Sequence, residues 1–293
     1  MAAALSWTGE GVRLGEVDAA LARLRGEAAS DHPSMRTSVM THIAWVPEPW
    51  QERALAALEG MGERHPSRTI LLFPDADSGL DRIDATASLE SFEVPDSDRR
   101  IVSEVVELRL HGTRAKAPAS VVEPLLVSDL PVFLRWRGEP PWGAPELDEL
   151  LRVTDRLIVD STEWDDVPYA YRHLSALFGR AATSDIAWAR TSRWRSLLAS
   201  LWPGIADVGA IRVRGTAAQA WLLAGWLRSR LGRDVALDHV EAERLEGIDL
   251  DGEAAPFPPG DPPLPSDVLS DELERFARDP VYEAAVGAAA AAS

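Results

Sequence analysis

Short aliphatic runs alternate with amphipathic segments between residues 16 and 240, and this alternation restricts the fold more than any other feature of the sequence. Runs rich in β-branched and aliphatic residues predict strands, whereas apolar residues spaced three and four apart predict helices. The predicted strands cover residues 36–46, 68–73, 88–94, 101–110, 131–136, 155–160, 210–214 and 235–240, and the predicted helices cover 16–27, 49–61, 117–127, 146–153, 167–178 and 216–231. We therefore predict an α/β fold: a mixed, largely parallel sheet with helices on both faces, plus a C-terminal helical tail after a Pro-rich linker.

The first part of the chain contains a predicted βαβ unit and a predicted hairpin. The strand at 36–46, the helix at 49–61 and the strand at 68–73 form the unit, whose crossover is expected to be right-handed. The strands at 88–94 and 101–110 are joined by the turn-rich sequence PDSDRR, which predicts a hairpin with a long connection.

Composition and pattern divide the chain into four parts. Residues 1–112 form an N-terminal α/β region with the βαβ unit and the hairpin, and residues 113–250 form a second α/β region. Residues 251–267 are rich in proline and predict an extended linker. Residues 268–293 return to a helical pattern, so we expect a helical tail that docks on its own domain or on a partner.

The charge and the absence of cysteine exclude several classes of protein. A formal net charge of −17 argues against binding to nucleic acid or to an anionic membrane. A chain without cysteine has no thiol catalysis, no cysteine-based metal site and no disulfide switch. No apolar segment is long enough to span a bilayer, and the first residues lack a signal-peptide pattern. The sequence therefore predicts a soluble cytoplasmic protein.

Tryptophan and arginine are concentrated in residues 183–202, TSDIAWARTSRWRSLLASLW, which we call the Trp/Arg block. It carries three tryptophans and three arginines, with no acidic residue between Asp185 and Asp207. Its second half has the apolar spacing of a helix that ends before Pro203. Indole and guanidinium groups are enriched at interface hot spots, and arginine also suits phosphate or carboxylate partners. Packing of the tryptophans in a core, with the arginines paired to acids, is the competing interpretation.

Motifs of catalysis or metal binding are missing from the sequence. No GxGxxG fingerprint follows a strand, and neither a GxxxxGK[ST] phosphate loop nor a GxSxG elbow occurs. The six histidines are scattered without a metal-binding pair, so we expect no metal site and no cofactor. Active sites can still assemble from distant positions, but the absence of these motifs favours a binding or regulatory protein over an enzyme.

Several stretches together resemble the OpcA family of glucose-6-phosphate dehydrogenase assembly proteins. The Trp/Arg block is the most specific of them. The matching stretches are ALARLR (20–25), HPSRTILL (65–72), VEPLLVSDLPVFLRW (122–136), the Trp/Arg block (183–202), AWLLAGWLRSRLG (220–232) and ELERFARDPVYEAAV (272–286).

The resemblance implies a non-catalytic protein that binds glucose-6-phosphate dehydrogenase and promotes its active oligomer or activates it allosterically. Such a protein supports NADPH production in the oxidative pentose phosphate pathway. In the cyanobacterial branch the family is linked to thioredoxin, but a chain without cysteine cannot itself carry a thiol switch. The family provides no catalytic residues. For partner binding we nominate Trp188, Arg190, Trp194 and Arg195, and in second place Arg135, Trp136, Arg137 and Trp142.

The alternative is an α/β enzyme or sensor that binds a sugar phosphate or a nucleotide, with the arginines holding phosphate. The fold class and the arginines favour it, whereas the missing phosphate loop, dinucleotide fingerprint and nucleophile count against it. Regulation of the assembly role by a small metabolite is left open by the sequence.

Overall fold

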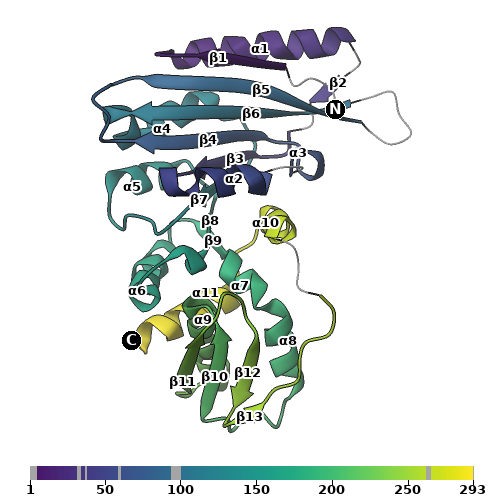
Figure 1. Ribbon diagram of the computed structural model, residues 1–293, viewed down its shortest axis with the longest axis vertical. Coiled ribbons are helices and arrows are strands. Elements are labelled where there is room, and N and C mark those ends of the chain that lie inside the picture. Colours follow the sequence, from purple (N-terminus) through teal and green to yellow (C-terminus); the bar gives the residue numbers. More distant parts are fainter. Residues whose placement is uncertain are drawn as a thin grey trace. The chain divides into compact units, whose positions relative to one another are not determined.

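The computed structural model describes residues 5–31, 34–36, 38–58, 61–93, 100–261 and 265–292 (Figure 1). The chain forms two compact units, unit 1 (Met1–Leu157) and unit 2 (Ile158–Ser293). Strand β8 (Arg156–Val159) contains the boundary between them.

Unit 1 contains seven described strands besides β8, and five α-helices. The strands are β1 (Leu5–Gly9), β2 (Ser34–Arg36), β3 (Thr41–Trp45), β4 (Arg68–Asp75), β5 (Ile83–Glu93), β6 (Arg100–His111) and β7 (Val132–Trp136). The helices are α1 (Leu14–Asp31), α2 (Gln51–Leu58), α3 (Met61–Arg64), α4 (Pro118–Val122) and α5 (Pro145–Arg152), with 3-10 turns η1 (Glu48–Trp50), η2 (Gly112–Lys116) and η3 (Glu123–Leu125).

The strands of unit 1 form one mixed sheet in the order β1-β5-β6-β4-β3-β7, with β2 beside β6. Strands β6, β4, β3 and β7 are parallel neighbours, whereas β5 is antiparallel to both β1 and β6. The connection from β3 through α2 to the parallel strand β4 confirms the predicted βαβ unit. The antiparallel pairing of β5 with β6 confirms the hairpin, although most of its PDSDRR connection lies outside the described residues.

Strand pairing shows which residues share a face of this sheet. Ala44 and Leu71 are partners, and both belong to a core cluster with Ala54 of α2. On the opposite face, Arg68 is the partner of Glu104, and Arg25 of α1 donates from Nη1 to the Glu104 carboxylate at 2.6 Å. Helices α1 and α2 therefore cover opposite faces, as predicted.

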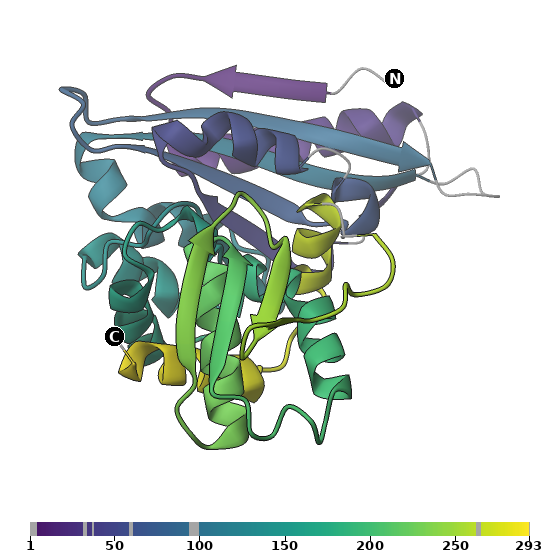
Figure 2. The same ribbon diagram turned by 60° about the horizontal axis from the view of Figure 1, so that its bottom comes forward.

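Unit 2 is built around a small sheet and a central helix. Its strands are β9 (Ala182–Asp185), β10 (Ala210–Gly215), β11 (Ala236–Glu241), β12 (Gly247–Leu250) and β13 (Glu253–Ala254). Its helices are α6 (Val167–Leu177), α7 (Ile186–Arg190), α8 (Ser192–Ser200), α9 (Ala217–Leu231), α10 (Pro265–Leu273) and α11 (Pro280–Ala291), with the 3-10 turn η4 (Ser161–Glu163). The sheet order is β11-β10-β12-β13, and α9 connects the parallel strands β10 and β11. Figure 2 shows α9 behind this sheet.

The mixed, largely parallel α/β fold with C-terminal helices confirms the predicted fold class. One predicted strand was wrong in extent: residues 36–46 contain β3 and the end of β2, because β2 pairs with β6 whereas β3 pairs with β4 and β7. The four-part division of the chain stays a prediction, and residues 262–264 of its linker lie outside the described residues. Among the described residues, no helix combines the length and apolarity needed to cross a membrane.

Candidate functional site

The Trp/Arg block folds as a strand followed by two short helices. Strand β9 ends at Asp185, whose carboxylate caps α7 by accepting from the Ala187 amide at 2.9 Å. Thr191 separates α7 from α8 and makes no capping bond to α8, because its hydroxyl donates to the Trp188 carbonyl at 2.8 Å. The block therefore turns between its first and second tryptophan, which directs their side chains to different neighbours.

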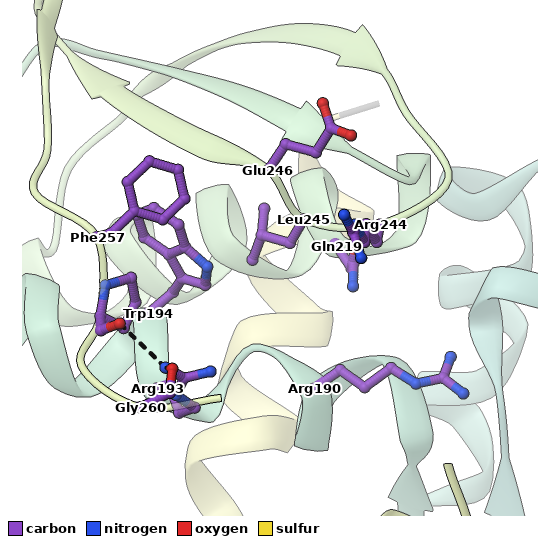
Figure 3. Close-up of a pocket in the computed structure, with 10 residues that line it drawn as sticks. Arg190, Arg193, Trp194, Gln219, Arg244, Leu245, Glu246, Phe257 and Gly260 are labelled. Carbon is purple, nitrogen blue, oxygen red and sulfur yellow. Dashed lines mark hydrogen bonds between the residues drawn. The ribbon is translucent and has the colours of Figure 1, made fainter. Parts of the chain in front are cut away.

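A cavity of about 730 Å³ opens beside α8 within unit 2 (Figure 3). In this view Phe257 and Trp194 lie at the left, Arg244 and Gln219 at the right, and Leu245 between them. Three segments that are distant in the sequence supply most of the lining, and α9 adds Gln219. The lining residues are Arg190, Arg193, Trp194, Gln219, Arg244, Leu245, Glu246, Phe257, Pro258 and Gly260. We call this cavity the arginine pocket.

Local bonds hold the wall of the arginine pocket. The Nη2 of Arg193 donates to the carbonyl of Pro258 at 3.0 Å and also to the carbonyls of Pro259 and Gly260, which pins the proline-rich segment to α8. The rings of Trp194 and Phe257 are 5.6 Å apart between centroids. The predicted linker is thus an ordered part of a pocket wall at these positions.

The tip of α9 closes the pocket at Gln219. The Thr216 hydroxyl accepts from the Gln219 amide, and the Gln219 side chain accepts in return from the Thr216 amide, a capping box. Gln219 is buried, so its position is fixed by the helix start.

Arginine dominates the charge of the pocket. Three of its lining residues are arginines and one is a glutamate, within a chain of net charge −17. Arg190 is paired through Nη1 with Asp160 at 3.1 Å. Arg193 is bonded to uncharged carbonyls, and Arg244 has no hydrogen-bond or ion-pair partner in the described part of the chain. The lining is therefore locally basic and suited to an anionic group.

A buried polar cluster lies in the same unit. The Asp185 carboxylate accepts from the Ser161 hydroxyl at 2.6 Å and from the Tyr282 hydroxyl at 3.4 Å, and Tyr171 contacts the Ser161 hydroxyl at 2.9 Å. Burial, followed by the nearby charge of Asp160, raises the pKa of Asp185 to about 7. These bonds tie β9, η4, α6 and α11 together, and sequence patterns gave no indication of them.

The four first-choice residues have unequal access to a partner. Trp188 and Trp194 are buried, whereas Arg190 and Arg195 are partly exposed. Trp188 donates from Nε1 to Asp279 at 2.9 Å, and the Arg195 guanidinium lies 3.4 Å from the centroid of its ring. Burial lowers the pKa of Arg195 to about 10, so this stacked side chain is still cationic at neutral pH.

The four second-choice residues lie in unit 1 and are mostly buried. Trp136 stacks on Trp45 with 5.0 Å between centroids. Arg135 donates to the Trp136 carbonyl at 2.6 Å, and Arg137 lies over the ring of Trp50. Trp142 is partly exposed and donates to Glu139 at 2.8 Å. Four of the nominated residues thus belong to each unit.

Arg190 and Trp194, which the sequence nominated for partner binding, line the arginine pocket, whereas its other lining residues were not nominated. Arg244, Leu245 and Glu246 follow the last predicted strand, and Phe257 lies in the predicted linker. The clustering of arginine with tryptophan was the only available signal, because the remaining lining comes from sequence-distant loops. In the described ranges, no group of three or more histidine, aspartate and glutamate side chains is arranged to hold a metal ion.

Fold and site define a two-unit α/β protein whose second unit carries an arginine-lined pocket. Residues 59–176 match the family described as glucose-6-phosphate dehydrogenase subunit N-terminal domain, and residues 181–256 match the C-terminal domain of the same subunit. The chain belongs to the OpcA family.

Curated relatives agree with this family. The OxPP cycle protein OpcA of Nostoc punctiforme is 26% identical over 181 residues, which cover 57% of this chain and 38% of the relative. Its counterpart in Synechocystis sp. is 25% identical over 193 residues, covering 59% and 40% respectively. The chain thus spans about two fifths of the length of the curated relatives it matches.

A solved structure is also similar. It is the WlbA (WbpB) dehydrogenase of Thermus thermophilus in complex with NAD and alpha-ketoglutarate, with a TM-score of 0.47 and 13% identity over 86% of this chain and 94% of that one.

Proposed function

We propose that this chain is a non-catalytic partner of glucose-6-phosphate dehydrogenase that promotes its active oligomer and activates it allosterically. In this role it supports NADPH production in the oxidative pentose phosphate pathway. The observation that carries the proposal is the match of residues 59–176 and 181–256 to the two domains described for a subunit of that enzyme.

Activation requires a difference in affinity between two states of the enzyme. A partner shifts an equilibrium only as far as it binds the active state more tightly than the inactive one. A hundredfold preference is about 2.7 kcal/mol, which a few desolvated side chains can provide.

Exposure determines which side chains can make such contacts without rearrangement. Arg190, Arg195 and Trp142 are partly exposed among the nominated residues, and Trp202 at the end of the Trp/Arg block is 65% exposed. We assign Trp202 the central contact, because a large exposed indole gains much from burial at an interface.

The direct test uses the purified chain and the purified dehydrogenase of the same organism. We expect the chain to raise dehydrogenase activity and to shift the enzyme to a larger assembly in native mass spectrometry. Unchanged activity together with an unchanged mass over a tenfold excess of the chain would contradict the proposal.

Trp202→Ala tests the assigned contact. Because Trp202 is exposed, its removal leaves the fold intact, and we expect about a thirtyfold weaker affinity for the dehydrogenase, as for a hot-spot residue. Phe276→Ala is the matched control, since this aromatic side chain is similarly exposed at 62%. Equal affinities of the two variants would reject the assignment. Arg190 and Arg195 are poorer probes, because Arg190 pairs with buried Asp160 and Arg195 stacks on Trp188.

A further inference from the structure

The arginine pocket carries positive charge that unit 2 does not neutralise. Arg244 has no partner in the described part of the chain, and the bonds of Arg193 go to carbonyl oxygens. Arg190 uses one of its five N–H donors on Asp160. Glu246 is the one acid in the lining, and Asp160 pairs with Arg190 from outside it, which leaves an excess of one positive charge over the cavity. Arginines from two segments, the α7–α8 stretch and the loop after β11, can donate to an anion with several oxygens.

An apolar wall faces these arginines. Phe257 is 73% exposed although its ring lies against Trp194, and Leu245 extends the same apolar surface. An exposed phenyl ring beside a cavity gains free energy when a flat group covers it, and base–aromatic stacking is worth about 1–3 kcal/mol. The wall thus favours a ligand that has a planar ring as well as a charge.

The volume and the polar groups restrict the ligand further. A cavity of about 730 Å³ lies within the usual range of small-molecule sites. The carboxylate of Glu246 accepts hydrogen bonds and so can bind an amino or hydroxyl group of the ligand. A free phosphate would leave the apolar wall uncovered, and a nucleoside without phosphate would leave the arginines unpaired.

We infer that the arginine pocket binds a nucleotide, with its phosphates on Arg190, Arg193 and Arg244 and its base against Phe257 and Trp194. The inference stands apart from the dehydrogenase role, because binding is measured on the chain alone. The two therefore fail independently.

Isothermal titration calorimetry of the full chain in low salt with EDTA tests the inference. The probes are ATP, adenosine, tripolyphosphate and glucose 6-phosphate. We expect ATP to bind at one site, and each of the other probes to bind at least about tenfold more weakly. Adenosine lacks the phosphates, whereas tripolyphosphate and glucose 6-phosphate lack a planar ring. Absence of ATP binding at millimolar concentration, or equal affinity for any other probe, would overturn the inference.

Two variants locate the binding. Arg244→Ala and Phe257→Ala change exposed side chains, so the fold is retained, and each is expected to weaken ATP binding about tenfold or more. The matched controls are Arg212→Ala, an exposed arginine of β10 outside the pocket, and Phe276→Ala. If the pocket variants bind ATP as tightly as their controls, the site is not the arginine pocket.

Discussion

Asp185 is a buried carboxyl group whose bonds connect four elements of unit 2. Its Oδ1 accepts from the amides of Ser161 and Ala187, at 3.0 and 2.9 Å, and its Oδ2 accepts from the hydroxyls of Ser161 and Tyr282. Burial opposes the charged form more strongly than these donors favour it, so the pKa is raised from 3.8 to about 7. A side chain that caps a helix thereby also becomes sensitive to pH near neutrality.

The stability of unit 2 should depend on the protonation of Asp185. The pKa of Asp185 is higher in the folded than in the unfolded chain. Its contribution to the free energy of unfolding is therefore fully present below about pH 4 and is lost as the pH rises through about 7. The loss is on the order of 4 kcal/mol. We expect Asp185→Asn, which mimics the neutral form, to flatten the free energy of unfolding between pH 5 and pH 8 in urea titrations.

A matched variant separates this effect from general changes of charge. Asp207→Asn removes an exposed carboxylate of the same unit and should leave the pH profile parallel to that of the unchanged chain. If the Asp185→Asn profile is also parallel, Asp185 of the unchanged chain is ionised between pH 5 and pH 8. The hydrogen-bond donors, and not burial, then determine its protonation.

Helices α9 and α11 pack closely because small residues meet at their crossing. A Cβ on Gly225 of α9 would overlap the Ala285 carbonyl oxygen and approach Ala289 within 3.0 Å. Val286 and Tyr282 of α11 are buried in the same unit. The C-terminal helix therefore belongs to the core of unit 2.

Gly225→Ala should destabilise the chain even though alanine is the better helix former. The added methyl forces the two backbones apart, and overpacking of this kind costs about 1–3 kcal/mol, which exceeds the gain in helix propensity of about 0.5–1 kcal/mol. Gly287→Ala is the control in α11, since a Cβ there meets nothing within 4 Å, and we expect it to stabilise. Urea unfolding measures both, and a stabilising Gly225→Ala would refute the close crossing.

The helices and strands that were predicted well from the sequence have characteristic residues at their ends or along their length. Helix α9 begins after Thr216 and ends before Gly232, whose positive φ of 65° suits glycine, and both ends follow from residue type. Strands β9 (ATSD) and β12 (GIDL) were missed, because they lack the continuous aliphatic run that marks a strand of equal length such as β8 (RLIV). The alanine run after residue 287 reads as a tail, yet it continues α11, since Ala289 fits against Gly225. Tertiary packing, which local patterns do not encode, decided these cases.

The net charge of the whole chain and the local charge of the arginine pocket have opposite signs. Its net charge of −17 acts on any large polyanion that approaches, whereas the arginine pocket presents three cationic side chains to a ligand small enough to enter. Screening limits the reach of exposed charges to about 8 Å at physiological ionic strength. A small anion in the pocket therefore meets mainly the local arginines, but a long duplex meets the acidic surface as well.

Duplex DNA is accordingly expected to bind far more weakly than a nucleotide. A non-specific DNA-binding protein gains its affinity by releasing counterions at several phosphates, and it typically reaches a Kd of about 10⁻⁴–10⁻⁶ M. Three arginines in a cavity cannot make such a row of contacts without bringing the acidic surface against the DNA. We expect fluorescence anisotropy with a labelled 20-base-pair duplex to show no saturation up to about 100 µM chain at 50 mM salt. A Kd for the duplex below about 10 µM that rises steeply with salt would contradict this prediction. It would mean that the basic residues, and not the net negative charge, dominate the electrostatic field of the whole molecule.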